Sequence, residues 1–306
     1  MRTINIFNKD IEIREYGCCN RNNSPQIIMP PRLNLFIQIT QNCNANCKFC
    51  EYHTPSNYNF NVEKLDEIIK EIKSKINLGK FNLTGGEPTL NLELFDKVFK
   101  CMESNFTKER HPEITVNTNG IHLKELVKYE DFIDYIGLSH HHYIDEKNYE
   151  IFGTKSVASN KDILEFQSKV NNKNILQIRC NLINGYIDNF DELKNFLDEM
   201  IKLNVRDCGF VTLMPLNDFC NTHQIDFQNL VKLNTLDVIK TNCWHRLDKE
   251  TLSKKVCECG NYIYSNEKGK VCKFYSRYFC NASLNEGQLV YDGKNLRFGF
   301  GGEIIY

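Results

Sequence analysis

The regular alternation of strand-like and helix-like segments between Leu33 and Leu213 constrains the fold of this chain more than any other feature. The strand-like segments are short and rich in β-branched and aromatic residues, and the longer segments between them repeat apolar residues at helical spacing. Residues 62–76 show this spacing, with Leu65, Ile68, Ile69, Ile72 and Ile76 on one face. A chain that alternates in this way builds a parallel sheet with right-handed crossovers.

The alternation predicts an α/β fold, a partial (β/α)6 barrel with its helices outside. Strands are expected at residues 33–40, 81–84, 114–117, 132–139, 175–182 and 208–213, and helices at residues 62–76, 92–101, 122–129, 157–170 and 190–203. In such sheets the active site forms at the carboxyl ends of the strands.

The two flanks of this region predict smaller units. Residues 1–31 form an N-terminal hairpin extension, with a turn at Asn8-Lys9-Asp10, and residues 32–216 form the partial barrel. Residues 217–306 lose the alternation, apart from a helical pattern at about 227–241. We expect a small cysteine-rich domain organised by metal there, because so short a segment with many turns has little core of its own.

Composition limits the compartment and the partners. The net charge of −1 gives no basic surface for nucleic acid or for an anionic membrane. No apolar run has the length of a membrane span, and charges interrupt the first 30 residues where a signal peptide needs an apolar core. With 14 cysteines and no export signal, a reducing cytoplasm and metal ligation are more plausible than disulfides.

Two motifs follow directly after expected strands. Cys43, Cys47 and Cys50 form a CxxxCxxC run, and Gly85-Gly86-Glu87-Pro88 follows the next strand along the chain. Three thiolates on a four-iron cluster leave one iron without a protein ligand, and that iron is open for chemistry. A structural zinc site is the competing interpretation, but it needs a fourth ligand, for which only His53 is near.

The cysteine spacing, the aromatic Phe49 before the last cysteine and the Gly-Gly-Glu turn together resemble the radical S-adenosylmethionine (radical SAM) superfamily. The resemblance implies a [4Fe–4S] cluster on Cys43, Cys47 and Cys50, with the amino and carboxylate groups of SAM bound at the open iron. It also implies reductive cleavage of SAM to methionine and a 5′-deoxyadenosyl radical, with a reductant such as flavodoxin or ferredoxin as partner.

The same resemblance implies a set of SAM contacts, each with a structural alternative. Phe49 would lie beside the adenine, or it could be a packing residue of the fold. The backbone of the Gly-Gly-Glu turn would contact the methionyl amino group. Alternatively, Glu87 could cap the helix that follows. Polar residues at three further strand ends would contact ribose or carboxylate, although Asn-Gly is also a common turn and a strand arginine can be a structural ion pair. The residues implied in SAM binding are Phe49, Gly85, Gly86, Glu87, Asn117, Asn119, Ser139 and Arg179.

Three adjacent histidines follow the fourth expected strand. Side chains alternate between faces in an extended segment, so His140 and His142 can converge. We expect these two to bind substrate or to transfer protons at the mouth of the barrel, with solvated loop histidines as the alternative.

A second group of cysteines lies near the C-terminus and resembles the twitch or SPASM-type extensions of radical SAM enzymes. The resemblance implies one auxiliary [4Fe–4S] cluster, with Cys243, Cys257, Cys259 and Cys280 as ligands. Cys272 is left out because it falls within the second strand of an expected hairpin, residues 262–264 and 271–278. Four thiolates form a closed zinc site equally well.

The resemblance predicts an oxidoreductase or lyase that abstracts a hydrogen atom from a peptide or amino-acid-like substrate. Only a hairpin is expected ahead of residue 32, and it offers no winged helix for a leader peptide, which weakens the peptide interpretation. A small-molecule radical SAM oxidoreductase or cyclase is the nearest alternative. Two other classes fit less well. A non-catalytic iron–sulfur or zinc protein would not need a Gly-Gly-Glu turn. A glycyl-radical activase would carry additional ferredoxin-like CxxCxxC runs, which this sequence lacks.

Overall fold

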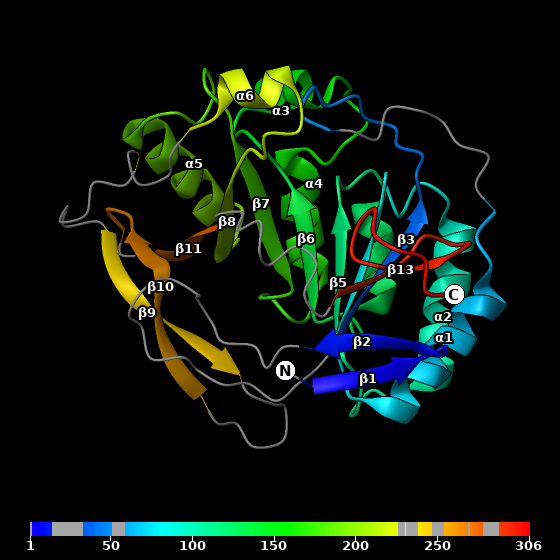
Figure 1. Cartoon of the computed structure of the whole chain (residues 1–306). Helices are drawn as coiled ribbons and strands as arrows, with labels where there is room; N and C mark the ends of the chain where they lie inside the picture. The colour runs from blue at the N-terminus through cyan, green and yellow to red at the C-terminus, as the bar shows by residue number, and fades with distance from the viewer. Residues whose placement is uncertain are drawn as a thin grey trace.

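One mixed sheet of eleven strands organises the molecule (Figure 1). The computed structural model describes residues 2–13, 33–50, 59–225, 230, 238–246, 254–268, 270–277 and 288–306. The strand order is β13-β12-β3-β4-β5-β6-β7-β8-β11-β10-β9, and the six central strands are all parallel. These six are β3 (Leu33–Thr40), β4 (Leu78–Gly85), β5 (Glu113–Thr118), β6 (Tyr135–Ser139), β7 (Leu176–Leu182) and β8 (Asp207–Thr212). The fold is therefore α/β with a mostly parallel sheet.

Seven helices are described along the chain. They are α1 (Val62–Lys75), α2 (Leu92–Asn105), the 3-10 helix η1 (Leu123–Tyr129), α3 (Asp145–Phe152), α4 (Asn160–Lys169), α5 (Phe190–Lys202) and α6 (Asp218–His223). Figure 1 shows α1 and α2 beside β3, and α5 beside β7 and β8. Their buried apolar residues join those of the strands in one core.

The two faces of the parallel sheet differ in chemistry. One face, called here the apolar face, carries fully buried residues of the core such as Ile37, Leu83, Val116, Leu138 and Ile178. Side chains alternate along each strand, so the remaining residues lie on the opposite face, called here the polar face. The polar face carries Asn34, Gln38, Asn82, Asn117, Gln177 and Arg179 among others.

The six expected strands and the five expected helical segments are all present. Two differences concern local geometry. The segment 122–129 forms a 3-10 helix, and the strand expected from residue 132 begins at Tyr135, because the backbone N–H groups of Phe132 and Ile133 bond to Tyr129 O in a turn. Helices α3 and α6 were not expected; with 8 and 6 residues they are too short to display a clear apolar period.

The strands of the C-terminal part extend the same sheet at both edges. They are β9 (Val238–Arg246), β10 (Lys254–Ser265), β11 (Val271–Arg277), β12 (Gln288–Tyr291) and β13 (Leu296–Phe298). Strand β11 pairs in parallel with β8, and β12 pairs in parallel with β3. The sheet is thus continuous across the expected boundary at residues 216 and 217, and the division of the chain into three domains stays a prediction.

Two expectations about the flanks are confirmed and one is wrong. The N-terminal hairpin is present as β1 (Arg2–Ile6) and β2 (Lys9–Ile13), with positive φ angles at Phe7 and Asn8, and β10 and β11 form the expected antiparallel hairpin. The helix expected at about 227–241 does not extend to its end, because Val238 and the residues after it pair with β10 as a strand. Residues 227–229 and 231–237 of that segment lie outside the described residues.

None of the helices in the described ranges has the length and the apolar character that a membrane crossing requires.

Candidate functional site

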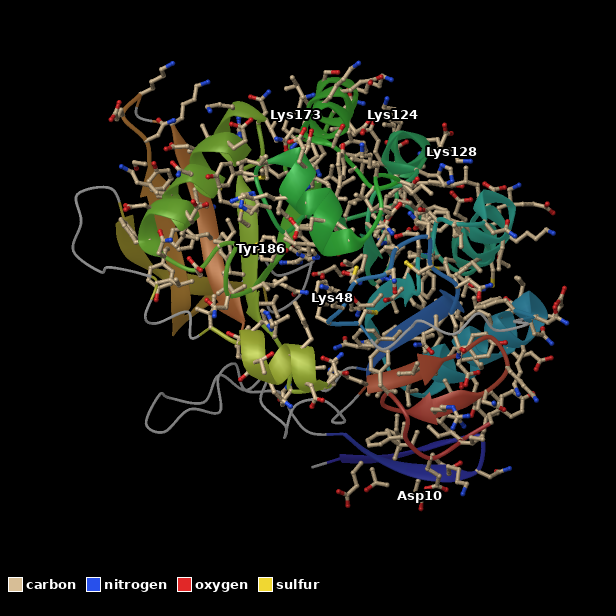
Figure 2. All side chains as sticks on the ribbon, turned by 90° about the horizontal axis from the view of Figure 1, so that it is seen from above. Asp10, Lys48, Lys124, Lys128, Lys173 and Tyr186 are labelled. Atoms are coloured by element: carbon tan, nitrogen blue, oxygen red, sulfur yellow. The ribbon has the colours of Figure 1, made fainter. Side chains whose placement is uncertain are left out.

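Three strand ends meet at one edge of the sheet. The cysteine loop, residues 41–50, follows β3, the Gly-Gly-Glu turn ends β4, and Thr118 and Asn119 end β5. Figure 2 looks down on this edge, and Lys48 in the middle of the view marks the cysteine loop. The parallel sheet brings the motifs together because all six strands point the same way.

The cysteine loop is held in place by two helices that lie beside it. The backbone N–H of Asn46 donates to Phe152 O at the end of α3, at 2.8 Å. The side chain of Asn217, which begins α6, donates to Lys48 O at 3.1 Å. Within the loop, the N–H of Cys50 donates to Cys47 O at 2.9 Å and the N–H of Ala45 points to Cys43 Sγ at 3.4 Å. The three cysteines are therefore fixed relative to one another.

The thiols of this loop influence one another electrostatically. Burial raises the pKa of Cys47 to about 12, and the charges of Cys50 and Cys43 act in the same direction. Burial also raises the pKa of Cys43, and Glu87 and Cys50 add to the effect. Such thiols ionise only when a cation is bound, because a bound metal stabilises the thiolate.

The two glycines of the turn allow it to cross the cysteine loop. A Cβ on Gly86 would lie 2.2 Å from Asn42 O, and a Cβ on Gly85, whose φ is +148°, would lie 2.1 Å from Thr40 O. At this crossing, the N–H of Gly86 donates to Thr40 O at 2.7 Å and the N–H of Glu87 donates to Asn42 O at 2.8 Å. The close approach expected at these glycines is thus made to the loop that carries the cysteines.

Glu87 is fully buried and joins the turn to β5. Its carboxylate accepts hydrogen bonds from Thr89 N (3.0 Å), Thr89 Oγ1 (2.6 Å), Thr118 Oγ1 (2.7 Å) and Asn119 N (2.7 Å). Burial raises the pKa of Glu87, whereas these donors act to lower it. The helix-capping alternative is wrong, because Asn91 caps α2.

Asn119 extends this network to the cysteine loop. Its side-chain amide donates to Asn44 Oδ1 at 2.9 Å, and the same nitrogen lies 3.8 Å from Cys43 Sγ. The sequence Asn119-Gly120 also forms a turn, since the N–H of Ile121 donates to Asn119 Oδ1. The turn expected at this Asn-Gly pair is therefore present, while the contact of Asn119 with SAM stays a prediction.

A glycine separates two polar side chains on the polar face. A Cβ on Gly137 would lie 2.8 Å from Asn117 Oδ1 and 3.5 Å from Arg179 Nε. Arg179 donates to Gln177 on its own strand, and Ser139 pairs in register with Arg179. The missing side chain of Gly137 therefore lets the Asn117 amide and the Arg179 guanidinium lie close together over this residue, near the carboxyl ends of β5, β6 and β7.

Comparison with known proteins decides the family. A family model described as the radical SAM superfamily matches residues 37–200, which is more than half of the chain. The chain belongs to the radical SAM superfamily. It is an enzyme, and membership implies a [4Fe–4S] cluster and SAM as its cofactors and the need for a reductant.

Relatives within the superfamily match only part of this radical SAM chain. A probable GTP 3′,8-cyclase from Thermoplasma volcanium is 28% identical over 173 residues, which cover 55% of this chain and 50% of the relative. Crystal structures of Streptococcus suis SuiB bound to S-adenosylmethionine and to precursor peptide SuiA give TM-scores of 0.52 and 0.51 at 17% and 18% identity. They cover 64% and 62% of this chain and 44% and 41% of theirs, and they show the fold alone. The chain thus spans half the length of these relatives or less.

The residues at the strand ends fit the radical SAM cluster and its ligand. Each thiolate of a four-iron cluster binds a different iron, so the three sulfurs need not surround one ion. Accordingly, no three Cys, His, Asp or Glu side chains of the described residues are grouped around a single metal position. Cys43, Cys47 and Cys50 lie on one loop. Beside Gly137, the Asn117 amide and the Arg179 guanidinium are polar groups that suit an amino-acid ligand.

Phe49 packs at the base of the cysteine loop. Its half-buried ring makes an edge contact with His141 at a centroid distance of 5.2 Å, and its carbonyl accepts from Cys220 Sγ at 3.6 Å. The packing alternative is therefore confirmed, while the contact with adenine stays a prediction.

The structure buries His140 and His142, so the alternative of solvated loop histidines is wrong, while their expected role in substrate binding or proton transfer stays a prediction. Both side chains are fully buried, and burial lowers the pKa of each to about 4. His140 lies between Asn160 Oδ1 (3.1 Å) and Asn148 Nδ2 (3.2 Å), and His142 Nδ1 accepts from Ile144 N at 3.0 Å. Both rings are thus held within the fold, but among the described residues His142 Nε2 makes no hydrogen bond and lies 3.9 Å from Glu192 Oε2. Of their partners, Ile144 precedes α3, Asn148 lies within it and Asn160 is the first residue of α4. The sequence pattern did not reveal α3.

The C-terminal cysteines are described in part. The backbone register of β9 and β10 pairs Cys243 with Cys257, and Cys259 follows where this register shifts. Cys280 lies outside the described residues. Cys272 is fully buried in the core with its Sγ 3.7 Å from Cys208 Sγ, which agrees with leaving it out of the ligand set.

Sequence reasoning missed several residues of the site. The hydrogen-bond network around Glu87 and Asn119 is completed by Thr89, Thr118 and Asn44. Gly137 leaves room for Asn117 and Arg179 to lie close together. Thr118 stands inside the motif Val116-Asn117-Thr118-Asn119-Gly120 that was already singled out, so its position at a strand end was the available signal. The position of Gly137 in the middle of an expected strand was a further signal, because a strand glycine often marks a close approach.

Proposed function

We propose that this radical SAM enzyme reductively cleaves SAM and abstracts a hydrogen atom from a peptide or amino-acid-like substrate. The observation that carries the proposal is the rigid junction of the cysteine loop with the Gly-Gly-Glu turn, made by the bonds from Gly86 N to Thr40 O and from Glu87 N to Asn42 O. We propose further that the six parallel strands form a partial barrel whose interior is the polar face.

Each part of the proposed function is assigned to residues of this chain. Cys43, Cys47 and Cys50 would hold the cluster, and the backbone of Gly85 and Gly86 would meet the methionyl amino group. Arg179 and Asn117, which lie together over Gly137, would bind the carboxylate. Three further residues, Asn119, Ser139 and Phe49, would orient the ribose and the adenine.

The bound cluster and SAM supply one electron and an adenosyl radical able to remove hydrogen from an unactivated carbon. The protein residues contribute binding, orientation and exclusion of water. Asn119 donates towards Cys43, the first ligand of the loop, and the bonds from α3 and α6 keep that loop from moving. A fixed loop keeps reactive groups in place, which is how an active site lowers the entropic cost of reaction.

The balance of charge on the polar face favours a peptide-like substrate. The described inward positions of β3 to β8 carry two basic residues, Lys80 and Arg179, and two acidic residues, Glu113 and Asp207. Lys80 forms an ion pair with Glu113 at 2.7 Å, and the other polar residues of this face are largely amides and hydroxyls. Amides and hydroxyls suit the backbone of a peptide, whereas a triphosphate calls for several basic groups.

A small-molecule reaction is the second candidate. It is favoured by the relatives named GTP 3′,8-cyclase, with which this chain shares 28% identity over 173 residues in the first case. These relatives are matched over 29% to 50% of their own length, so their names do not give the substrate of the present chain.

We also propose that residues 217–306 hold an auxiliary [4Fe–4S] cluster of the twitch or SPASM type. The direct pairing of Cys243 with Cys257 in the β9–β10 register supports this proposal, because it brings two of the four expected ligands to adjacent strands. Zinc in the same cysteines is the competing possibility.

The core proposal is tested by the cleavage of SAM. In anaerobically reconstituted protein with dithionite, Cys43→Ala, Cys47→Ala or Cys50→Ala should each abolish formation of 5′-deoxyadenosine, measured by chromatography. Cys101→Ala, which removes a buried cysteine from α2, is the matched control and should retain it. Wild-type product formation in any of the three loop variants would contradict the assignment. Several-fold stimulation of wild-type cleavage by added GTP would favour the cyclase alternative over the peptide substrate.

A further inference from the structure

Glu87 is a carboxylate with no route to solvent in a site that is otherwise lined by thiols and amides. Its side chain is 1% exposed and lies at the junction of β4, β5 and the cysteine loop. Its carboxylate accepts four hydrogen bonds, from Thr89, Thr118 and Asn119 of the same junction. Such an arrangement calls for a role inside the fold.

The side chain of Glu87 fixes the end of β5. Its Oε1 accepts from Thr118 Oγ1 at 2.7 Å, and its Oε2 accepts from the backbone N–H of Asn119 at 2.7 Å. Thr118 Oγ1 in turn accepts from Gly120 N at 2.9 Å, so three successive residues depend on this contact. Charge-assisted bonds of this length to a carboxylate are among the stronger ones in proteins.

Two routes connect Glu87 to the first cysteine of the loop. Through the backbone, its N–H donates to Asn42 O at 2.8 Å, one residue before Cys43. Through the side chain, it holds Asn119, whose amide nitrogen lies 3.8 Å from Cys43 Sγ and 2.9 Å from Asn44 Oδ1. The charge of Glu87 also acts directly on the Cys43 thiol, in the direction that disfavours further negative charge.

We propose that Glu87 is a positioning residue, which fixes Asn119 against Cys43 and whose negative charge holds the reduction potential of the cluster low. Reduction adds one electron to the cluster, and a buried carboxylate nearby makes that addition less favourable. The potential of an iron–sulfur cluster responds to net charge and to hydrogen bonds at its sulfurs, and Glu87 acts on both. The inference rests on the superfamily's cluster and is independent of the peptide substrate proposed above.

The effect of the Glu87 charge is tested by two variants that should shift the midpoint potential of the cluster in opposite directions. Glu87→Gln removes the charge with little change in shape, so the midpoint potential of the reconstituted cluster should shift to more positive values. Thr118→Val removes one donor to the carboxylate and leaves its charge less compensated, so the potential should shift to more negative values. Both are measured by anaerobic redox titration followed by electron paramagnetic resonance, together with iron content.

Glu93→Gln is the matched control, because this carboxylate lies in the first turn of α2 with its side chain 80% exposed and paired with Lys97. Its potential should equal that of the wild type. A lower melting temperature in Glu87→Gln with an unchanged potential and spectrum indicates a structural role only and overturns the inference. If Glu87→Gln does not fold, Thr118→Val decides: a wild-type potential overturns the proposal, and a negative shift supports it.

Discussion

Gly86 lies where the turn after β4 crosses the cysteine loop, and the space for a side chain there is already filled by backbone. The nearest atoms to a Cβ at this position are Asn42 O at 2.2 Å, Asn42 C at 2.5 Å and Gln41 O at 2.6 Å. Backbone atoms cannot rotate away as a flexible side chain can. A residue larger than glycine must therefore push the loop that carries Cys43.

We expect Gly86→Ala to reduce the iron content of the reconstituted protein to well under half of the wild-type value at the Cys43 cluster. The physical reason is displacement of residues 41 and 42, which precede the first ligand. The iron content is measured by iron analysis and by the absorbance near 400 nm. The C-terminal cysteines are also replaced in the protein used, so that only the cluster of the cysteine loop contributes. Gly185→Ala is the control: its φ of +90° strains an alanine by about 1 kcal/mol, but nothing lies within 4 Å of the added Cβ, so iron should be retained.

Residues of the site differ in how far the sequence alone could predict them. The cysteines and glycines were predictable because spacing and residue type together define their motif. The bonds of Glu87 were not, because its partners Thr118 and Asn119 lie about 30 positions further along the chain and meet it only through the pairing of β4 with β5. The burial of His140 and His142 was not predictable either, because nothing in the local sequence reveals that Asn148 of α3 and Asn160 of α4 lie against His140 or that both rings are enclosed.

At the scale of single elements, helix α6 lies against the cysteine loop, which is distant from it in the sequence. Asn217 caps the helix by accepting from Cys220 N at 2.9 Å, and the same side chain donates to Lys48 O at 3.1 Å. Asn189 caps α5 in the same manner, accepting from Glu192 N at 3.0 Å, but it makes no described bond to the cysteine loop. A comparison of variants at the two asparagines can therefore distinguish the stabilisation of a helix from the support of the cysteine loop.

Replacement of either asparagine by alanine should lower the stability of the protein by about 1 kcal/mol, the usual cost of a lost N-cap. Only Asn217→Ala should also speed the loss of the cluster, because Lys48 O loses its donor. Bleaching of the absorbance near 400 nm in air, compared with Asn189→Ala at matched stability, measures this difference. Equal bleaching rates in the two variants would mean that α6 does not support the loop.

The sequence predicted the longer helices and the segment that forms η1, but it did not predict α3 and α6. Helices α1, α2 and α5 have 13 or 14 residues, and their apolar periods predicted bounds within a few positions of those observed. Helices α3 and α6 have at most 8 residues, so two turns or fewer left no period to detect. These short helices hold the cysteine loop, which is why the support of the site was harder to predict than its ligands.

At the scale of the whole molecule, strands of the C-terminal part of the chain pair with both edges of the parallel sheet, while a separate C-terminal domain stays a prediction. Strand β11 extends the sheet beyond β8, and β12 extends it beyond β3, at the opposite edge. Pairings between strands so distant in sequence leave no local pattern, so the parallel core was predictable and these additions were not. The cysteines of β9 and β10 are consequently part of the same sheet that presents the cysteine loop.

Metal content distinguishes the two interpretations of these C-terminal cysteines. If Cys243, Cys257, Cys259 and Cys280 bind a second cluster, the anaerobically reconstituted wild type should contain about eight irons, and the triple alanine variant of Cys43, Cys47 and Cys50 about four. Cys272→Ala is the control, because its thiol lies in the core against Cys208, and it should keep the wild-type content. A zinc site would instead leave the triple variant with about one zinc, almost no iron and no absorbance near 400 nm, since zinc has a filled d shell. That result would remove the auxiliary cluster and leave a single cluster, on Cys43, Cys47 and Cys50, to perform the chemistry of the enzyme.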